Sequence, residues 1–218
     1  TLVLDRGGHV DKYLGDGLMA FWGAPVATPN DAESACEAAM LMQARFDEKR
    51  AEWEKKCGRK LVLRAGIETG DTVVGEMGTL HRVNYTVMGE PVATAARLEA
   101  LAKRYGVRTL VGETLVEEAK DAYLFRPLDT VRMGREGQPI HIFELLAPLS
   151  EPGFEWVRDY EAAYLAWRER RFADALTAFQ ALAATRPDDA VVARYVARCT
   201  AFVATAPAAA WDGIYDGD

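Results

Sequence analysis

The sequence predicts an α+β fold, in which helices pack on a mixed β-sheet, followed by a small α-helical segment. Short runs of alternating polar and apolar residues, which are typical of half-buried strands, lie between longer runs with helical spacing. After residue 153 the strand-like runs stop and the chain becomes rich in alanine and other helix formers. We therefore expect two domains, residues 1–147 and residues 148–218.

The composition is that of an ordinary globular protein. Half of the 218 residues are hydrophobic, so the chain can bury a full core. The net charge of −7 argues against a nucleic-acid-binding surface, which needs a basic patch, but a nucleotide site needs only a few cations. The three cysteines form no zinc motif, so reduced thiols are expected. No apolar run approaches about 18 residues, so no segment of this chain is expected to span a membrane.

The first expected elements are a helix end and a β-hairpin. Residues 1–5 have the pattern of a last helical turn. Segments 10–14 and 18–22 alternate in polarity and flank Gly15-Asp16-Gly17, which is a typical hairpin turn. Asp16 at this tip is either a plain turn residue or a carboxylate ligand for a hard cation such as Mg²⁺.

The rest of the first domain alternates between helices and strands. Asn30 and Asp31 can cap a long helix, and Gly58 and Gly106 fit the ends of two helices. Because helices connect several of the strands, we expect both parallel and antiparallel pairs in the sheet. The expected elements are helices 32–56, 92–105 and 112–122 and strands 60–68, 73–77, 85–87, 108–111, 126–133 and 140–145.

The second expected domain follows a turn-rich run, residues 147–153. Residues 160–184 contain an Ala-x₃-Phe pair and precede a helix-ending proline, which fits one tetratricopeptide unit. Another amphipathic helix, ending near residue 204, can be capped by Asp188 or Asp189. Because one repeat unit cannot bury its own apolar face, we expect it to pack on the first domain, on the last helix or on a second chain.

Three short motifs follow one another along the first domain. They are Val10-Asp11-Lys12-Tyr13-Leu14-Gly15-Asp16, then Gly66-Ile67-Glu68-Thr69-Gly70, then Tyr85-Thr86-Val87-Met88-Gly89-Glu90-Pro91-Val92 with the helix that bears Arg97. In this order and spacing they resemble the catalytic domain of class III nucleotidyl cyclases, which make cyclic AMP or cyclic GMP. The resemblance covers about residues 7–146, and the ordered set is more specific than any single motif.

The resemblance implies a ferredoxin-like cyclase domain that uses two Mg²⁺ or Mn²⁺ ions per site. Asp16 matches one of the two carboxylates that bind metal in the family. We expect the strand with the other carboxylate, and the loop that holds the triphosphate, to precede Thr1, so that the first strand is missing here. In the family the sites lie between two catalytic domains, which implies a homodimer with shared sites.

Lys12 and Thr86 match the two positions that contact the purine base in the family. Lys12 can donate to adenine N1, and Thr86 can accept from the exocyclic amine. A guanine-selecting site would resemble Glu and Cys at these positions, so the resemblance implies ATP as the substrate. The Lys-Thr pair looks like the subgroup in which some members respond to bicarbonate. The alternative interpretation is a solvent-exposed strand lysine and a threonine favoured by its β-propensity.

The family also uses an Asn and an Arg, one helical turn apart, to stabilise the transition state. Arg97 matches the arginine, whereas Ala93 stands where the asparagine is usual. Losing one preorganised donor typically costs about 10²–10³ in rate. Arg135 matches a basic residue that contacts the phosphates. The sequence therefore predicts a weakened adenylyl cyclase; the alternative is an inactive pseudo-cyclase used for dimerisation or nucleotide sensing.

The last residues, Trp211-Asp212-Gly213-Ile214-Tyr215, resemble the ending of bacterial cyclases that carry an N-terminal extracytoplasmic sensor. We therefore expect the chain to be the cytoplasmic part of a bacterial inner-membrane sensor protein. Contact with the membrane is expected only through a region upstream of Thr1.

Overall fold

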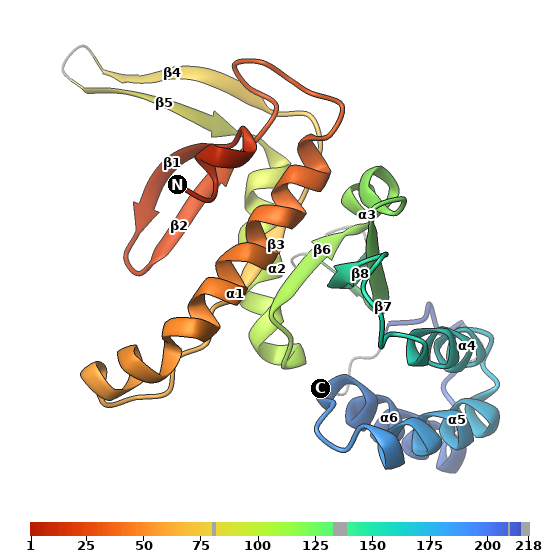
Figure 1. Cartoon of the computed structure of the whole chain (residues 1–218). Coiled ribbons are helices and arrows are strands. Elements are labelled where there is room, and N and C mark those ends of the chain that lie inside the picture. The colour runs from red at the N-terminus through yellow and green to blue at the C-terminus, as the bar shows by residue number, and fades with distance from the viewer. Residues whose placement is uncertain (80–81, 133–138, 209, 215–218) are drawn as a thin grey trace.

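The computed structural model describes residues 1–79, 82–132, 139–208 and 210–214. It has the α+β architecture that the sequence predicts, with a C-terminal group of helices (Figure 1). In chain order the elements are η1 (Leu4–Arg6), β1 (His9–Leu14), β2 (Gly17–Phe21), α1 (Asp31–Cys57), β3 (Ala65–Ile67), β4 (Val73–Thr79), β5 (Arg82–Met88), α2 (Glu90–Tyr105), β6 (Thr109–Gly112), α3 (Glu113–Ala119), β7 (Tyr123–Arg132), β8 (Pro139–Pro148), α4 (Trp156–Arg168), α5 (Phe172–Thr185) and α6 (Ala190–Ala204). None of the helices described is long and apolar enough to cross a membrane.

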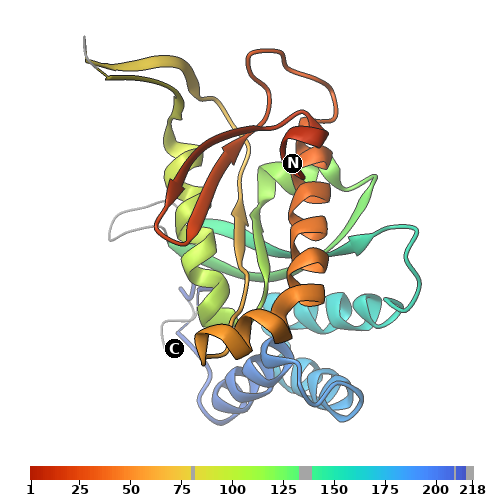
Figure 2. The same ribbon diagram turned by 60° about the vertical axis from the view of Figure 1, so that its left-hand side comes forward.

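The central sheet has four strands in the order β3-β6-β8-β7. β3 runs parallel to β6, whereas β8 is antiparallel to both of its neighbours, so the sheet is mixed as predicted. β1 pairs with β2 in one separate hairpin, and β4 pairs with β5 in another. The β4–β5 hairpin extends away from the central sheet, and the β1–β2 hairpin lies beside the β4–β5 hairpin (Figure 2).

The central sheet is buried on both sides. Leu110 of β6, Leu128 of β7 and Ile142 of β8 belong to a core that also contains residues of α2 and α4–α6. Val111 of β6 belongs to a second core, which contains residues of α1 and α3. The neighbours Leu110 and Val111 therefore point to opposite faces of the sheet, as strand geometry requires.

The helix α2 lies directly on β3 because Gly66 has no side chain. A Cβ atom at Gly66 would lie 2.1 Å from the carbonyl oxygen of Ala95 and 2.4 Å from the backbone nitrogen of Glu99. No larger residue fits this approach without moving the helix. The glycine of the second motif thus fixes the position of the helix that carries Ala93 and Arg97.

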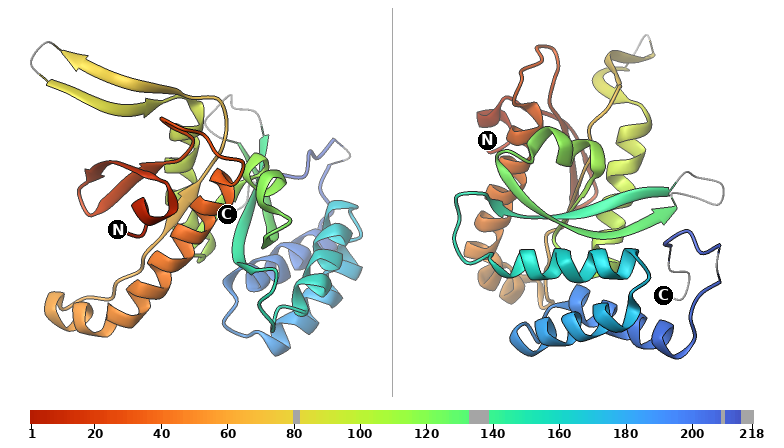
Figure 3. Two further views of the ribbon diagram at one scale, coloured as in Figure 1. Left: turned by 45° about the horizontal axis from the view of Figure 1, so that its top comes forward. Right: turned by 90° about the vertical axis from the view of Figure 1, so that its right-hand side faces the viewer.

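The C-terminal helices cover β7, which is an edge strand of the central sheet (Figure 3). β7 has a bulge at Leu128, between the paired residues Pro127 and Asp129. The Tyr160 hydroxyl donates to the carbonyl of Pro127 at 2.8 Å, and the Tyr195 hydroxyl donates to that of Leu128 at 2.6 Å. Helices α4 and α6 therefore satisfy edge carbonyls that strand pairing leaves over. The expected packing of this segment on the preceding part of the chain and on the last helix is observed, since residues of α4 and α5 share a core with residues of α2, the central sheet and α6.

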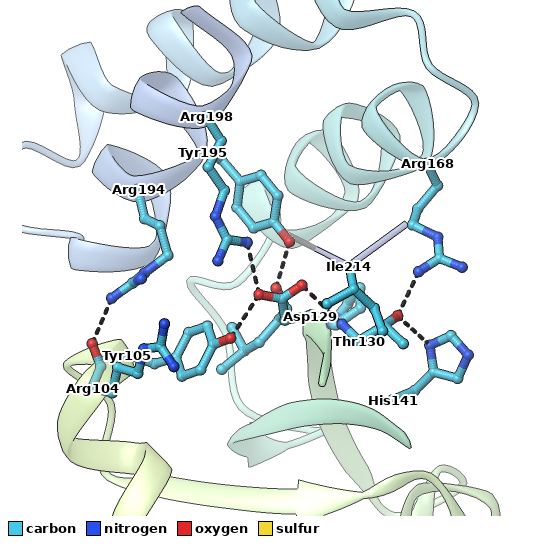
Figure 4. Close-up of polar contacts among 12 residues, drawn as sticks. Arg104, Tyr105, Asp129, Thr130, His141, Arg168, Arg194, Tyr195, Arg198 and Ile214 are labelled. Atoms are coloured by element: carbon cyan, nitrogen blue, oxygen red, sulfur yellow. Dashed lines mark hydrogen bonds and ion pairs between the residues drawn. The ribbon is translucent and has the colours of Figure 1, made fainter. Parts of the chain in front are cut away.

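Asp129 of β7 joins three elements in one buried cluster (Figure 4). Its carboxylate accepts hydrogen bonds from Arg198 of α6 at 2.7 Å and from Tyr105, the last residue of α2, at 2.6 Å. The backbone N–H of Thr130 donates to its other oxygen at 2.9 Å. Burial, and next the charge of Asp129, raise the pKa of Tyr105, so its phenol remains a donor. The end of α2 is therefore tied to both β7 and α6.

A second buried ionic contact fixes the start of α6. The guanidinium of Arg126 pairs with Glu144 at 2.6 Å and with Asp189 at 2.7 Å. Burial alone would raise the pKa of Asp189, but the hydrogen bond and charge of Arg126 outweigh it and lower that pKa. Asp189, rather than Asp188, caps α6 by accepting from the backbone N–H groups of Val191 and Val192.

Several predicted boundaries are wrong, and strand pairing explains two of them. The strand expected over 60–68 is limited to Ala65–Ile67, because only these residues pair with β6. The strand expected over 85–87 begins at Arg82, because it pairs with β4 along its whole length. The helix end expected at residues 1–5 is a single 3₁₀ turn, and the helix expected over 112–122 ends at Ala119.

Candidate active site

The β1–β2 hairpin carries two of the predicted site residues, Lys12 and Asp16. The strands pair on both sides of the Gly15-Asp16 turn, and Gly15 adopts a positive φ of 67° that favours glycine. The pairing slips between Val10 and Lys12, so Asp11 is an extra residue in β1, a β-bulge. In a regular strand the side chains of Asp11 and Lys12 would point to opposite faces. The bulge changes the direction of the Asp11 side chain relative to that of Lys12.

Lys12 and Thr86, which are 74 residues apart, are brought together where β1 meets β5. The Lys12 Nζ atom donates to the Thr86 Oγ1 atom at 3.1 Å. The Thr86 hydroxyl in turn donates to the Asp11 Oδ2 atom at 2.5 Å. Lys12 also lies 3.3 Å from the other carboxylate oxygen of Asp11. The three side chains form a compact polar group, which we call the β1–β5 triad.

The β1–β5 triad is buried at one end and open at the other. The Asp11 side chain is 1% exposed and Thr86 is 7% exposed, whereas the Lys12 side chain is 42% exposed. Lysine only donates hydrogen bonds and a carboxylate only accepts them. The open end therefore presents the Lys12 ammonium as a donor, with the Thr86 hydroxyl oxygen 3.1 Å from its nitrogen. This pairing suits a flat polar ring edge with an acceptor next to a donor.

Asp11 is the residue that the sequence analysis missed. It stands directly before Lys12 in an alternating segment, which predicts that the two side chains point to opposite faces. The bulge at Asp11 brings both side chains to Thr86, and the alternation of the segment does not predict a bulge.

Arg97 and Ala93 lie one turn apart on α2 and are both exposed. The Arg97 side chain makes no hydrogen bond or ion pair with any residue that the structure describes. Among the described residues nothing occupies its guanidinium, which can bind an anionic ligand, and the methyl group of Ala93 offers no donor beside it. Arg135 was the other predicted cation, and it lies outside the described residues.

Asp16 projects from the hairpin tip as an exposed carboxylate. It forms no hydrogen bond or ion pair within the described part of the chain. No group of three His, Cys, Asp or Glu side chains placed to hold a metal occurs among the described residues. Asp16 is thus a single candidate ligand, and the described residues do not by themselves complete a divalent-metal site.

Comparison with known families and proteins agrees with the motifs. The family described as "Adenylate and Guanylate cyclase catalytic domain" matches residues 8–143. Adenylate cyclase 1 of Rhizobium meliloti is 34% identical over 145 residues, which are 66% of this chain and 22% of that protein. An adenylate cyclase of Anabaena cylindrica is 31% identical over 150 residues, or 66% of this chain and 29% of that protein. The chain thus spans less than a third of either relative.

Solved structures with the same fold include cyclases of both base specificities. The crystal structure of the adenylyl cyclase CyaB from P. aeruginosa has a TM-score of 0.61 and 26% identity, and the match covers 70% of this chain and 78% of that one. The crystal structure of the guanylyl cyclase Cya2 has a TM-score of 0.59 and 25% identity, covering 70% of this chain and 76% of that one. Overall similarity therefore does not decide between ATP and GTP.

Proposed function

The chain belongs to the family of adenylate and guanylate cyclase catalytic domains, and we propose that it converts ATP to cyclic AMP and pyrophosphate. The observation that carries the choice of ATP is the β1–β5 triad, in which Lys12 presents a donor and Thr86 an oxygen. Adenine offers an acceptor, N1, beside a donor, the 6-amino group. Guanine offers the reverse, a donor at N1 beside an acceptor at O6, so the triad matches adenine.

The reaction is an intramolecular phosphoryl transfer. The ribose 3′-hydroxyl gives its proton to water, and its oxygen bonds to the α-phosphorus. The bond from that phosphorus to the oxygen that bridges the α- and β-phosphates breaks, and this oxygen leaves with the pyrophosphate. Lys12 and Thr86 hold the base, which fixes the ribose and the α-phosphate in place. Arg97, exposed and unpaired within the described residues, can neutralise charge that develops on the phosphate oxygens.

Members of this family typically need divalent cations, and Asp16 is the candidate ligand in this chain. Two such ions would activate the 3′-hydroxyl and bind the phosphates. Because Asp16 is exposed at a turn and has no protein partner among the described residues, its carboxylate can bind a cation without breaking another contact. Arg135 remains the proposed additional phosphate contact.

We propose that two copies of the chain share the sites, as the resemblance implies. In that arrangement Asp16 of one copy serves the nucleotide held by Lys12, Thr86 and Arg97 of the other. Several exposed apolar side chains lie on the two hairpins, and a partner chain could cover them. They include Tyr13, Leu14, Val73, Val83 and Met88, each more than half exposed.

Sharing of the sites has a direct test. Asp16→Ala and Lys12→Ala proteins should each be inactive, whereas a mixture should recover about a quarter of the wild-type rate, since half the dimers are mixed and each has one intact site. A mixture as inactive as its components would overturn the shared site.

The substrate assignment is tested with the full-length protein. With Mg²⁺ or Mn²⁺, kcat/KM for ATP should exceed that for GTP by about tenfold or more, because a site of this polarity rejects the wrong base edge. Thr86→Val should reduce this ratio, whereas Thr109→Val, a change at a buried threonine on β6, should leave it unchanged. An equal or reversed preference in the wild-type protein would overturn the assignment.

The second candidate function is that of a pseudo-cyclase which binds nucleotide and dimerises without turnover. Ala93 favours it, because an exposed methyl group on α2 replaces the family's amide. An active cyclase and a pseudo-cyclase would both bind nucleotide, but only the active cyclase would form cyclic AMP.

A further inference from the structure

We propose that Asp11 is a positioning residue that selects 6-aminopurine nucleotides by fixing the Thr86 hydroxyl as a hydrogen-bond acceptor. The inference rests on the proposed function, in which Lys12 and Thr86 bind the base. It concerns a side chain that does not itself touch the nucleotide.

The argument starts from the number of hydrogen atoms in the β1–β5 triad. A threonine hydroxyl has one hydrogen to donate, and its oxygen has two lone pairs. A lysine ammonium cannot accept that hydrogen, so the contact at 3.1 Å from Lys12 uses a lone pair of Thr86. The Asp11 carboxylate, 2.5 Å away, is the remaining partner and takes the hydrogen. The hydrogen of the Thr86 hydroxyl is therefore already bonded to Asp11 in the absence of a base.

Burial strengthens the hydrogen bond from Thr86 to Asp11. The Asp11 side chain is 1% exposed, so water does not compete for its oxygens, and Thr86 is almost as buried. A buried carboxylate that loses a hydrogen bond suffers a larger penalty than an exposed one. To donate toward a base, Thr86 would have to break its bond to Asp11 and leave that oxygen unpaired.

The consequence is a difference between purines that depends on the atom at position 6. The amino group of adenine can donate to the free lone pair of Thr86. The 6-oxo group of guanine or hypoxanthine is an acceptor, and it would face another lone pair. A threonine without Asp11 could rotate its hydroxyl and serve either base. Asp11 thus changes a hydroxyl that could donate or accept into one that only accepts from the base.

The bulge in β1 gives this role a structural origin. Without the extra residue, Asp11 and Lys12 would lie on opposite faces of the hairpin. With it, the acceptor that fixes Thr86 and the donor that binds the base come from adjacent residues. Bulges re-aim side chains in this way beside binding sites.

The test compares ATP with inosine triphosphate, which carries a 6-oxo group and lacks the 2-amino group of GTP. Affinities are measured on the full-length protein by displacement of a ribose-labelled fluorescent ATP, so turnover is not needed. The wild-type protein should prefer ATP, and Asp11→Asn should reduce that preference about tenfold or more, since an amide can also donate to Thr86. Both nucleotides carry the same triphosphate, so the loss of charge itself cancels in the ratio.

Two comparisons make the result specific. Asp5→Asn, which removes an exposed carboxylate on η1, should leave the ratio unchanged. In a Thr86→Val background Asp11→Asn should have no further effect on the ratio, because Asp11 acts through the hydroxyl. An unchanged ratio in Asp11→Asn, or an equal drop in the Thr86→Val background, would overturn the role of Asp11. A wild-type protein with no preference for ATP would instead overturn the proposed function, and this inference with it.

A measurement on the wild-type protein keeps the inference testable if Asp11→Asn does not fold. Purine riboside triphosphate has hydrogen at position 6, so it neither donates to Thr86 nor opposes it. The expected order of affinity is ATP, then the purine analogue, then 6-methoxypurine riboside triphosphate, which keeps the N1 acceptor that Lys12 binds and has an oxygen acceptor at position 6. If the methoxy analogue binds as well as the unsubstituted one, Thr86 is free to donate and the inference is wrong.

Discussion

Ala93→Asn tests whether the missing amide limits the rate. Ala93 lies in the first turn of α2, one turn before Arg97, and both side chains are exposed. An asparagine there would project on the same side as Arg97 and could donate to the ribose as the 3′-oxygen approaches phosphorus. We expect the substitution to raise kcat in the full-length protein.

The structure allows the two opposing effects to be compared. The change removes no buried packing, because the Ala93 methyl group is exposed. The loss of helix propensity is about 0.7 kcal/mol or less and acts on stability. A recovered transition-state donor is worth about 2.7–4 kcal/mol, or about 10²–10³ in kcat. The gain in rate should therefore be far larger than any loss from a less stable helix.

The assay is the initial rate of cyclic AMP formation as a function of ATP concentration. A contact made only in the transition state raises kcat and leaves KM nearly unchanged. Ala100→Asn is the matched control, since Ala100 is also exposed but lies seven residues on, about 10 Å along the helix. An equal rise in both variants, or no change with Ala93→Asn, would refute the reasoning. Nucleotide binding without turnover in every variant would favour the pseudo-cyclase.

Three further predictions concern single side chains in different parts of the fold. Asp16→Ala should abolish metal-dependent turnover and leave the melting temperature nearly unchanged, because the side chain is exposed and unpaired within the described residues. Asp129→Asn should lower the free energy of unfolding in urea by about 3–5 kcal/mol, since it removes the carboxylate charge from a buried ion pair with Arg198. Of the three thiols only Cys57 should react rapidly with Ellman's reagent at pH 8, since burial raises the pKa of Cys36 and Cys199 to about 12.

Each of these predictions has an outcome that contradicts it. Unfolding of the Asp16→Ala protein would make Asp16 a structural turn residue. For Asp129 the control is Asp212→Asn, which breaks an ion pair with Arg132 that is about half exposed and should cost about 1 kcal/mol or less. Similar losses from both substitutions would show that burial of the Asp129 pair is unimportant. Rapid reaction of all three thiols in the folded protein would contradict the burial of two of them.

Local patterns were sufficient for much of the fold. Gly58 and Gly106 end their helices in the left-handed conformation, as expected from glycine after a helical run. The hairpin around Asp16 was also predicted correctly, because its turn and its alternation are both local signals. The strand expected over 60–68 failed because its length depends on a partner, β6, that is distant in sequence.

The candidate site was predictable only in part. Family motifs gave Lys12 and Thr86, and the structure places them in contact, although their role in base selection remains a prediction. Asp11 was not found, because its direction depends on a bulge that alternation cannot reveal. The cluster around Asp129 was equally hidden, since it depends on how α2 and α6 converge on β7.

The two halves of the proposed site are held by different parts of the fold. The β1–β5 triad lies between two hairpins that are separate from the central sheet. Arg97 lies on α2, which is fixed to β3 at Gly66 and to β7 and α6 through Tyr105. A disturbance of the C-terminal helices therefore acts on α2 first, and it reaches the hairpins only through the start of α2, where β5 joins it at Gly89. It follows that substitutions in α6 which weaken the contact of Tyr105 with Asp129 should change kcat for ATP more than they change the ratio of kcat/KM for ATP to that for GTP.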